Sequence, residues 1–179
     1  MSDSGRIWLI SGVPGAGKTT VAQAICARFP RAVHVPVDDL RDFVVSGFAS
    51  PLEVAATPEM RLQFRLARRS AALMAALYAD EGFVVVIDDV VHPEHVDESY
   101  VTHLTRHRLR RVALVPSLEV ALERNRKRTT KWFAPEVLEG TIRDLHPTLF
   151  KDLTGWIVID NSELSAQETA DRILGAERD

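Results

Sequence analysis

Short runs of apolar residues alternate along the chain with longer segments in which apolar residues recur every three or four positions. This alternation predicts a parallel β-sheet flanked by helices. Val84-Val85-Val86-Ile87 is apolar at every position, which is typical of a central strand covered on both faces. Pro36 cannot donate a ladder hydrogen bond, so its strand is expected at a sheet edge. The predicted strands are Arg6 to Ser11, Ala32 to Val37, Phe83 to Asp88, Arg111 to Val115 and Gly155 to Asp160.

Helices are predicted between and after these strands, and several starts are well marked. Pro58, Pro93 and Pro135 are placed for the first helical position, and Ser165 with Glu168 matches a capping box. The predicted helices are Lys18 to Phe29, Asp39 to Val45, Pro58 to Ala79, Pro93 to Thr105, Leu118 to Arg128, Pro135 to Leu145 and Ala166 to Leu174.

Length and composition favour one compact α/β domain over residues 1–179, because the chain has 179 residues and is 46% hydrophobic and 26% charged. A net charge of -3 gives no global attraction to nucleic acid or an acidic membrane. The N-terminus lacks the apolar stretch of a signal peptide and no run of about 18 apolar residues occurs, so a cytoplasmic location is expected. Cys26, the one cysteine, is expected to pack within a helix.

The segment Gly12-Val13-Pro14-Gly15-Ala16-Gly17-Lys18-Thr19 follows an apolar strand, opens a helix and satisfies the pattern GxxxxGK[ST]. Its glycines let successive N–H groups point at phosphate oxygens, and the helix N-terminus adds its positive dipole. Lys18 is predicted to reach the β and γ phosphates of a bound nucleotide, and Thr19 to supply a hydroxyl to Mg²⁺. The predicted nucleotide contacts are Gly12, Gly15, Ala16, Gly17, Lys18, Thr19 and Thr20.

Two acidic pairs, Asp38-Asp39 and Asp88-Asp89, follow predicted strands, where ligands bind in an open parallel sheet. Asp38 is interpreted as the general base for an attacking hydroxyl, with a helix N-cap as the alternative. Asp88 is predicted to hold Mg²⁺ or contact the acceptor, and Asp89 competes for that role. Arg41 shares a side of the first helical turn with Asp38, where it would bind a charged acceptor unless it is an ordinary surface arginine.

Residues 124–131 carry five positive charges, and we expect a lid over about 124–134. Arg124 and Arg128 are four residues apart, so on a helix they share a face and can clamp one triphosphate, with Arg128 stabilising the transferred group. A solvated basic face is the alternative. Trp132 and Phe133 are expected to anchor the next helix.

Together these residues resemble the adenylate-kinase-like branch of the P-loop kinases, which includes gluconate and shikimate kinases, chloramphenicol phosphotransferase and polynucleotide 5′-kinase. The resemblance implies a P-loop three-layer fold whose five-stranded parallel sheet has the order 2-3-1-4-5. It also implies that Asp38 is the base, that Arg124 lies near adenine and that Arg128 lies on phosphate. Asn161 and Ser162 are further candidates for adenine contacts.

The resemblance leaves the acceptor open. Asp38-Asp39-Leu40-Arg41 is similar to the base and acceptor arginine of polynucleotide kinase, whereas Ile87-Asp88-Asp89-Val90 is similar to the chloramphenicol enzyme. We favour ATP-dependent transfer of the γ-phosphoryl group to a hydroxyl of a small molecule. One alternative is a polynucleotide 5′-hydroxyl kinase whose phosphates meet Arg41 and helix arginines. The other is a nucleotide-dependent switch. The helix arginines in question are Arg61, Arg65, Arg68 and Arg69.

Overall fold

The computed structural model describes residues 5–50, 57–128 and 134–176. Within these residues the sheet consists of five parallel strands in the order β2-β3-β1-β4-β5. The predicted strand number, direction and order are therefore confirmed, and so is the edge position of the strand that carries Pro36. The strands are β1 (Ile7–Ser11), β2 (Ala32–Pro36), β3 (Val84–Asp89), β4 (Leu109–Leu114) and β5 (Trp156–Ile159).

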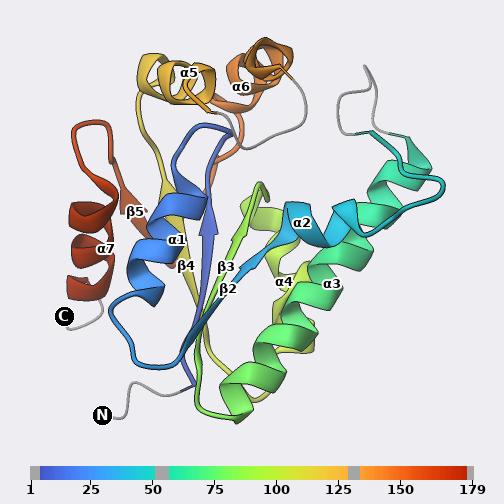
Figure 1. Ribbon diagram of the computed structural model, residues 1–179, viewed down its shortest axis with the longest axis vertical. Coiled ribbons are helices and arrows are strands. Elements are labelled where there is room, and N and C mark those ends of the chain that lie inside the picture. Colours follow the sequence, from blue (N-terminus) through green and yellow to red (C-terminus); the bar gives the residue numbers. More distant parts are fainter. Residues whose placement is uncertain (1–4, 51–56, 129–133, 177–179) are drawn as a thin grey trace.

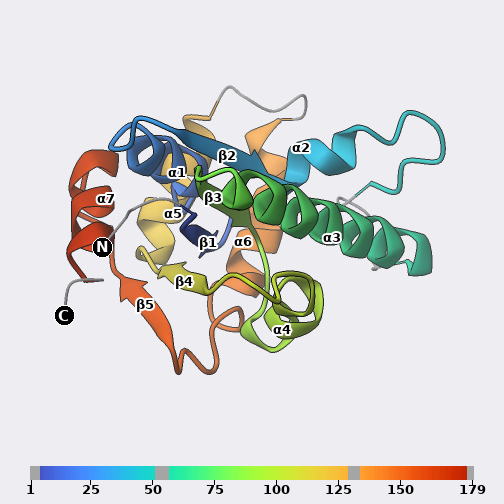
Figure 2. The same cartoon turned by 90° about the horizontal axis from the view of Figure 1, so that it is seen from below.

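Helices cover both faces of this sheet, with α1 and α7 on one side and α3 and α4 on the other (Figures 1 and 2). Helices α5 and α6 lie beyond the upper end of the sheet in Figure 1. The α-helices are α1 (Lys18–Cys26), α2 (Val37–Asp42), α3 (Pro58–Asp80), α4 (Val96–Ser99), α5 (Leu118–Arg126), α6 (Glu139–Leu145) and α7 (Ala166–Gly175), and the 3-10 helices are η1 (Pro93–His95), η2 (Val101–His103) and η3 (Pro135–Leu138). None of the described helices is both long and apolar enough to cross a bilayer.

Two hydrophobic cores result, because alternate residues of each strand point to opposite faces. Trp8 and Ile10 of β1 belong to the core under α1 and α7, and Ile7 and Leu9 belong to the core under α3 and α4. All five residues of β1 are buried, and so are all six of β3, as the uninterrupted apolar run of Val84 to Ile87 predicts for a central strand. Each core thus fixes one layer of helices against the sheet.

The predicted helix starts at Lys18, Pro58, Leu118 and Ala166 are confirmed, whereas the helix expected from Asp39 begins at Val37, and Pro93 and Pro135 begin 3-10 helices. Thr57 directly precedes Pro58, and its side chain accepts a hydrogen bond from the Met60 amide. Ser165 and Glu168 form a complete capping box. Each satisfies amide groups that the first turn of a helix leaves without intrahelical partners. These short local patterns therefore fix the starts of α3 and α7.

Several predicted boundaries are wrong. The helix expected over Pro135 to Leu145 is divided into η3 and α6. The helix expected over Pro93 to Thr105 is broken into η1, α4 and η2, and Tyr100 between the last two has φ -128 and ψ -55. Val96, Tyr100 and Leu104 are nevertheless buried, so the apolar spacing of four residues is kept while the helix is not. The strand expected to reach Val37 ends at Pro36, because Val37 begins α2.

Candidate active site

The glycine-rich loop between β1 and α1 has the backbone geometry that its sequence predicts. Gly15 and Gly17 have φ values of 83° and 92°, in the left-handed region that favours glycine. A Cβ atom on Gly15 would lie 2.1 Å from the Ala121 carbonyl oxygen, so the loop packs tightly under α5. Gly17 immediately precedes the first residue of α1, which aims the helix N-terminus into the space above the loop.

Lys18, the first residue of α1, folds back over this loop. Its Nζ atom donates hydrogen bonds to the carbonyl oxygens of Gly12 at 2.9 Å and of Val13 at 3.3 Å. Burial lowers the pKa of Lys18, and the nearby carboxylates of Asp88 and Asp38 oppose that effect. The ammonium group is thus held in place by the loop and faces acidic side chains from two other strand ends.

The two neighbouring aspartates of β3 point to opposite sides of the sheet. Asp88 pairs in register with Ile10, which belongs to the core under α1, whereas Asp89 pairs with Ser11. Asp88 accordingly lines a cleft above the glycine-rich loop. Asp89 does not line it, because its side chain faces α3 instead. The geometry therefore separates the two residues that the sequence left as competitors.

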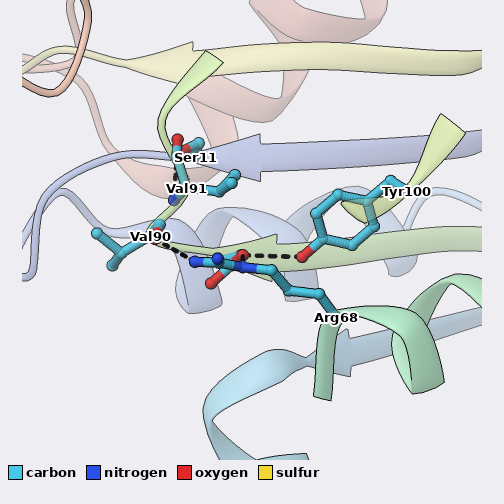
Figure 3. Close-up of polar contacts among 6 residues, drawn as sticks. Ser11, Arg68, Val90, Val91 and Tyr100 are labelled. Atoms are coloured by element: carbon cyan, nitrogen blue, oxygen red, sulfur yellow. Dashed lines mark hydrogen bonds and ion pairs between the residues drawn. The ribbon is translucent and has the colours of Figure 1, made fainter. Parts of the chain in front are cut away.

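A buried polar network holds Asp89 on the α3 side of the sheet, and Figure 3 shows its partners Arg68 and Tyr100. Arg68 Nε donates to Asp89 Oδ2 at 2.6 Å, and the Tyr100 hydroxyl donates to the same oxygen at 2.8 Å. Arg68 also donates to the Val90 carbonyl oxygen at 3.0 Å. Burial raises the pKa of Tyr100 well above its ordinary value, and the Asp89 carboxylate raises it further. These contacts join α3 and the segment after α4 to the end of β3.

The cleft has a volume of about 810 Å³ and collects most of the predicted site residues. Those that line it are Gly15, Gly17, Lys18, Thr19, Thr20, Asp38, Asp88, Arg124, Arg128 and Asn161. The predicted contacts Gly12, Ala16, Arg41 and Ser162 are not among its lining residues. Gly12 and Ala16 belong to the loop itself and are buried, and the carbonyl oxygen of Ala16 accepts a hydrogen bond from Asn161.

Asp38 is the second residue of α2, whereas the sequence placed it immediately before the helix. The N-cap alternative is wrong, because the helix begins at Val37 and Pro36 occupies the cap position. Burial lowers the pKa values of Lys18, Arg41 and Arg128, and the carboxylate of Asp38 opposes the shift in all three. Asp38 therefore lies among cations that come from three separate elements.

Arg124 and Asn161 connect the far wall of the cleft to the glycine-rich loop. Arg124 donates to the carbonyl oxygens of Asn161 at 2.8 Å and of Ser162 at 3.3 Å. The side chain of Asn161 is buried and donates from Nδ2 to the Ala16 carbonyl oxygen at 3.0 Å. The loop after β5 is thereby fixed against the phosphate end of the cleft.

Arg41 is neither on the surface nor in the cleft. It is 3% exposed, its guanidinium lies 3.8 Å from the ring centroid of Phe64, and it donates to the Ala49 carbonyl oxygen at 2.8 Å. The surface alternative is therefore wrong. Its buried Nε atom has no hydrogen-bond partner among the described residues.

Part of the predicted basic segment forms ion pairs with carboxylates of the chain and does not need a bound anion to balance its charge. Arg126 makes a bidentate contact with Glu139 at 2.6 and 3.0 Å, and Lys127 contacts Glu123 at 2.5 Å. Positions 129–133 of the expected lid, including Trp132 and Phe133, lie outside the described residues. Likewise, Arg68 turns inward to Asp89, so the four arginines of α3 do not form one outward row.

His34 is a cleft residue that the sequence reasoning did not assign to the site. It lies in β2, lines the cleft, and places Nε2 2.6 Å from Asp88 Oδ2. Leu164 and Ser165 are further lining residues that were not predicted, and Asp39 of the acidic pair and Lys127 of the basic segment also line the cleft. Residue spacing along one strand could not reveal the contact, because His34 and Asp88 are 54 positions apart.

The fold and the glycine-rich cleft define a P-loop nucleotide-binding domain of the kinase type. A family model described as an AAA domain matches residues 7–149, and the chain belongs to that family. No curated protein matches the chain.

Solved structures that resemble the chain at 17–19% identity confirm the P-loop kinase fold. The APS kinase of Mycobacterium tuberculosis, solved with AMPPNP and APS, has 17% identity and a TM-score of 0.70, with 98% of this chain and 99% of that chain covered. A gluconokinase from Sinorhizobium meliloti has 19% identity and a TM-score of 0.63, covering 95% and 90%. Shikimate kinase from Acinetobacter baumannii, solved with shikimate, has 17% identity and a TM-score of 0.61, covering 99% and 94%.

Proposed function

We propose that this protein is a kinase that transfers the γ-phosphoryl group of ATP to a hydroxyl group of a small molecule. The observation that carries the proposal is the convergence of Lys18, Asp38, Asp88 and Arg128 in one cleft above the glycine-rich loop. All three solved structures described above are named as kinases, and two of them are named a gluconokinase and a shikimate kinase. Both lines of support point to the same reaction class.

The cleft residues divide the reaction between them. The loop amides and Lys18 would bind the β and γ phosphates, since Nζ can exchange the loop carbonyls for phosphate oxygens. Asp38 would accept the proton of the attacking hydroxyl, and the phosphorus–oxygen bond to ADP would break as the new one forms. Arg128 would stabilise charge on the transferred group. Arg124 would lie toward the base, next to Asn161.

The residues present fit a Mg²⁺ ion bound with the nucleotide. Thr19 offers an exposed hydroxyl at the start of α1, and Asp88 offers a carboxylate that lines the same cleft. Oxygen ligands of this kind suit Mg²⁺, which keeps several waters and binds through one or two protein groups plus phosphates. The ion would neutralise charge on the β and γ phosphates. We assign this role to Asp88 rather than Asp89, whose carboxylate already binds Arg68 and Tyr100.

Arg41 lies three residues after Asp38 on α2 but is buried and does not line the cleft, so we propose that it supports the acceptor side indirectly, by holding α2 in place. Its Nε donor is free of partners within the described residues, while another guanidinium nitrogen fixes the Ala49 carbonyl. Arg41→Lys would keep the charge but lose the planar contact with Phe64, and should raise KM for the acceptor more than KM for ATP.

Transfer of labelled γ-phosphate from Mg·ATP tests the proposed reaction. The acceptor panel should contain sugars, sugar acids, nucleosides, aminoglycoside and phenicol antibiotics, and 5′-hydroxyl oligonucleotides. A labelled small product supports the proposal, and a labelled oligonucleotide replaces it with an end-kinase. Tight ATP binding with no labelled product from an extended panel would favour a nucleotide-dependent switch.

Two variants separate binding from chemistry. Lys18→Ala should abolish transfer, because it removes the cation at the phosphates. Asp38→Asn should keep ATP affinity within about twofold and lose roughly 10² to 10⁴ in kcat, the usual contribution of a general base. If Asp38→Asn lost ATP affinity as strongly as it lost kcat, Asp38 would instead have a structural role in α2.

A further inference from the structure

The contact between His34 and Asp88 joins the edge strand of the sheet to the candidate Mg²⁺ carboxylate. His34 pairs in register with Val86, and Pro36 pairs with Asp88, so the two side chains are diagonal neighbours on adjacent strands. Their Nε2 and Oδ2 atoms are 2.6 Å apart. The side chains of His34 and Asp88 are 15% and 8% exposed, so solvent competes little for the contact.

This contact occupies one of the two carboxylate oxygens of Asp88. A carboxylate can accept on either oxygen, and its plane is free to turn unless one oxygen is fixed. With Oδ2 held by the Nε2–H of His34, the second oxygen is the one available to the cleft. The strand order makes this possible, because β2 lies directly beside β3 at the sheet edge.

We infer that His34 is a positioning residue that orients the Asp88 carboxylate for the Mg·ATP complex. This inference rests on the proposed function and on the metal role assigned to Asp88. Hydrogen-bond partners of metal-binding carboxylates fix their orientation, and losing such a partner costs about 10- to 100-fold in metal affinity or activity. His34 acts through Asp88 and needs no contact with substrate.

Substitutions at His34 separate the hydrogen bond from mere packing. His34→Leu removes the donor at similar volume, His34→Asn keeps a polar group too short to reach Oδ2, and His34→Gln keeps an amide donor near the position of Nε2. A matched control is His107→Leu, which removes another histidine–aspartate contact, at 3.1 Å to Asp80, away from the cleft. Thermal melting of each variant reports folding independently of the site.

The decisive readout is the binding of a fluorescent ATP analogue, measured once with Mg²⁺ and once in EDTA. His34→Leu and His34→Asn should weaken binding with Mg²⁺ about tenfold or more and leave binding in EDTA within about twofold. His34→Gln should recover most of the loss, and His107→Leu should match the wild type in both conditions. Steady-state kinetics should show the same order among the variants.

A double variant tests whether His34 acts through Asp88. His34→Leu combined with Asp88→Asn should bind Mg·ATP no more weakly than Asp88→Asn alone, because both changes affect one interaction. Normal Mg²⁺-dependent binding by His34→Leu beside a defective Asp88→Asn would overturn only the inference about His34. Wild-type binding of Mg·ATP by Asp88→Asn would overturn both the metal assignment and the inference about His34. The proposed function would still be tested separately, by phosphoryl transfer to the acceptor panel.

Discussion

Replacing Asp89 with alanine should destabilise the protein far more than the same change at an exposed ion pair. Asp89 is 3% exposed and accepts hydrogen bonds from Arg68 and Tyr100. Without it, the guanidinium of Arg68 remains 15% exposed with no carboxylate, and removing one partner of a buried pair costs about 3–5 kcal/mol. Arg68 keeps its bond to the Val90 carbonyl, which favours the lower end of that range.

A loss of about 3 kcal/mol corresponds to a fall in Tm of roughly 6–12 °C for a chain of this length. The control is Asp97→Ala, because Asp97 contacts Arg111 at the same 2.6 Å but is 73% exposed. Exposed pairs contribute about 0–1 kcal/mol. Urea unfolding followed by tryptophan fluorescence and by circular dichroism measures both variants on one scale. If Asp89→Ala lost no more stability than Asp97→Ala, the argument that burial makes the Arg68–Asp89 pair important would be refuted.

Three further predictions concern the loop, the cleft wall and the cysteine. Gly15→Ala should lower ATP affinity at least about tenfold in a binding assay, because its Cβ would collide with the Ala121 carbonyl oxygen. The control Gly140→Ala should leave ATP affinity unchanged, because a Cβ on Gly140 would have no atom within 4 Å. Asn161→Ala should cost about 1–3 kcal/mol in urea unfolding by leaving the Ala16 carbonyl without its buried donor; no loss would contradict that contact. Burial raises the pKa of Cys26 to about 11, so at pH 8 a thiol reagent should react roughly two orders of magnitude more slowly with the folded protein than with the urea-unfolded chain.

Much of the fold could be predicted from local patterns in the sequence. Uninterrupted apolar runs marked the central strands, Pro36 marked the sheet edge, and Thr57-Pro58 and Ser165 with Glu168 marked helix starts. The glycine-rich loop was equally readable, because its left-handed φ angles need glycine and its lysine and threonine follow at fixed spacing. Each of these signals involves residues only a few positions apart.

Side-chain orientation and partners depended on the tertiary structure. A period of two tells that Asp88 and Asp89 point to opposite faces, but the packing of α1 and α3 decides which face carries the cleft. His34 meets Asp88 only because β2 lies beside β3, and Arg41 is buried because Phe64 of α3 packs over it. A local pattern does not indicate which partner lies tens of residues away. The sequence by itself therefore determined the phosphate-binding loop and the strands, and the packing of distant elements determined which charged side chains face that loop.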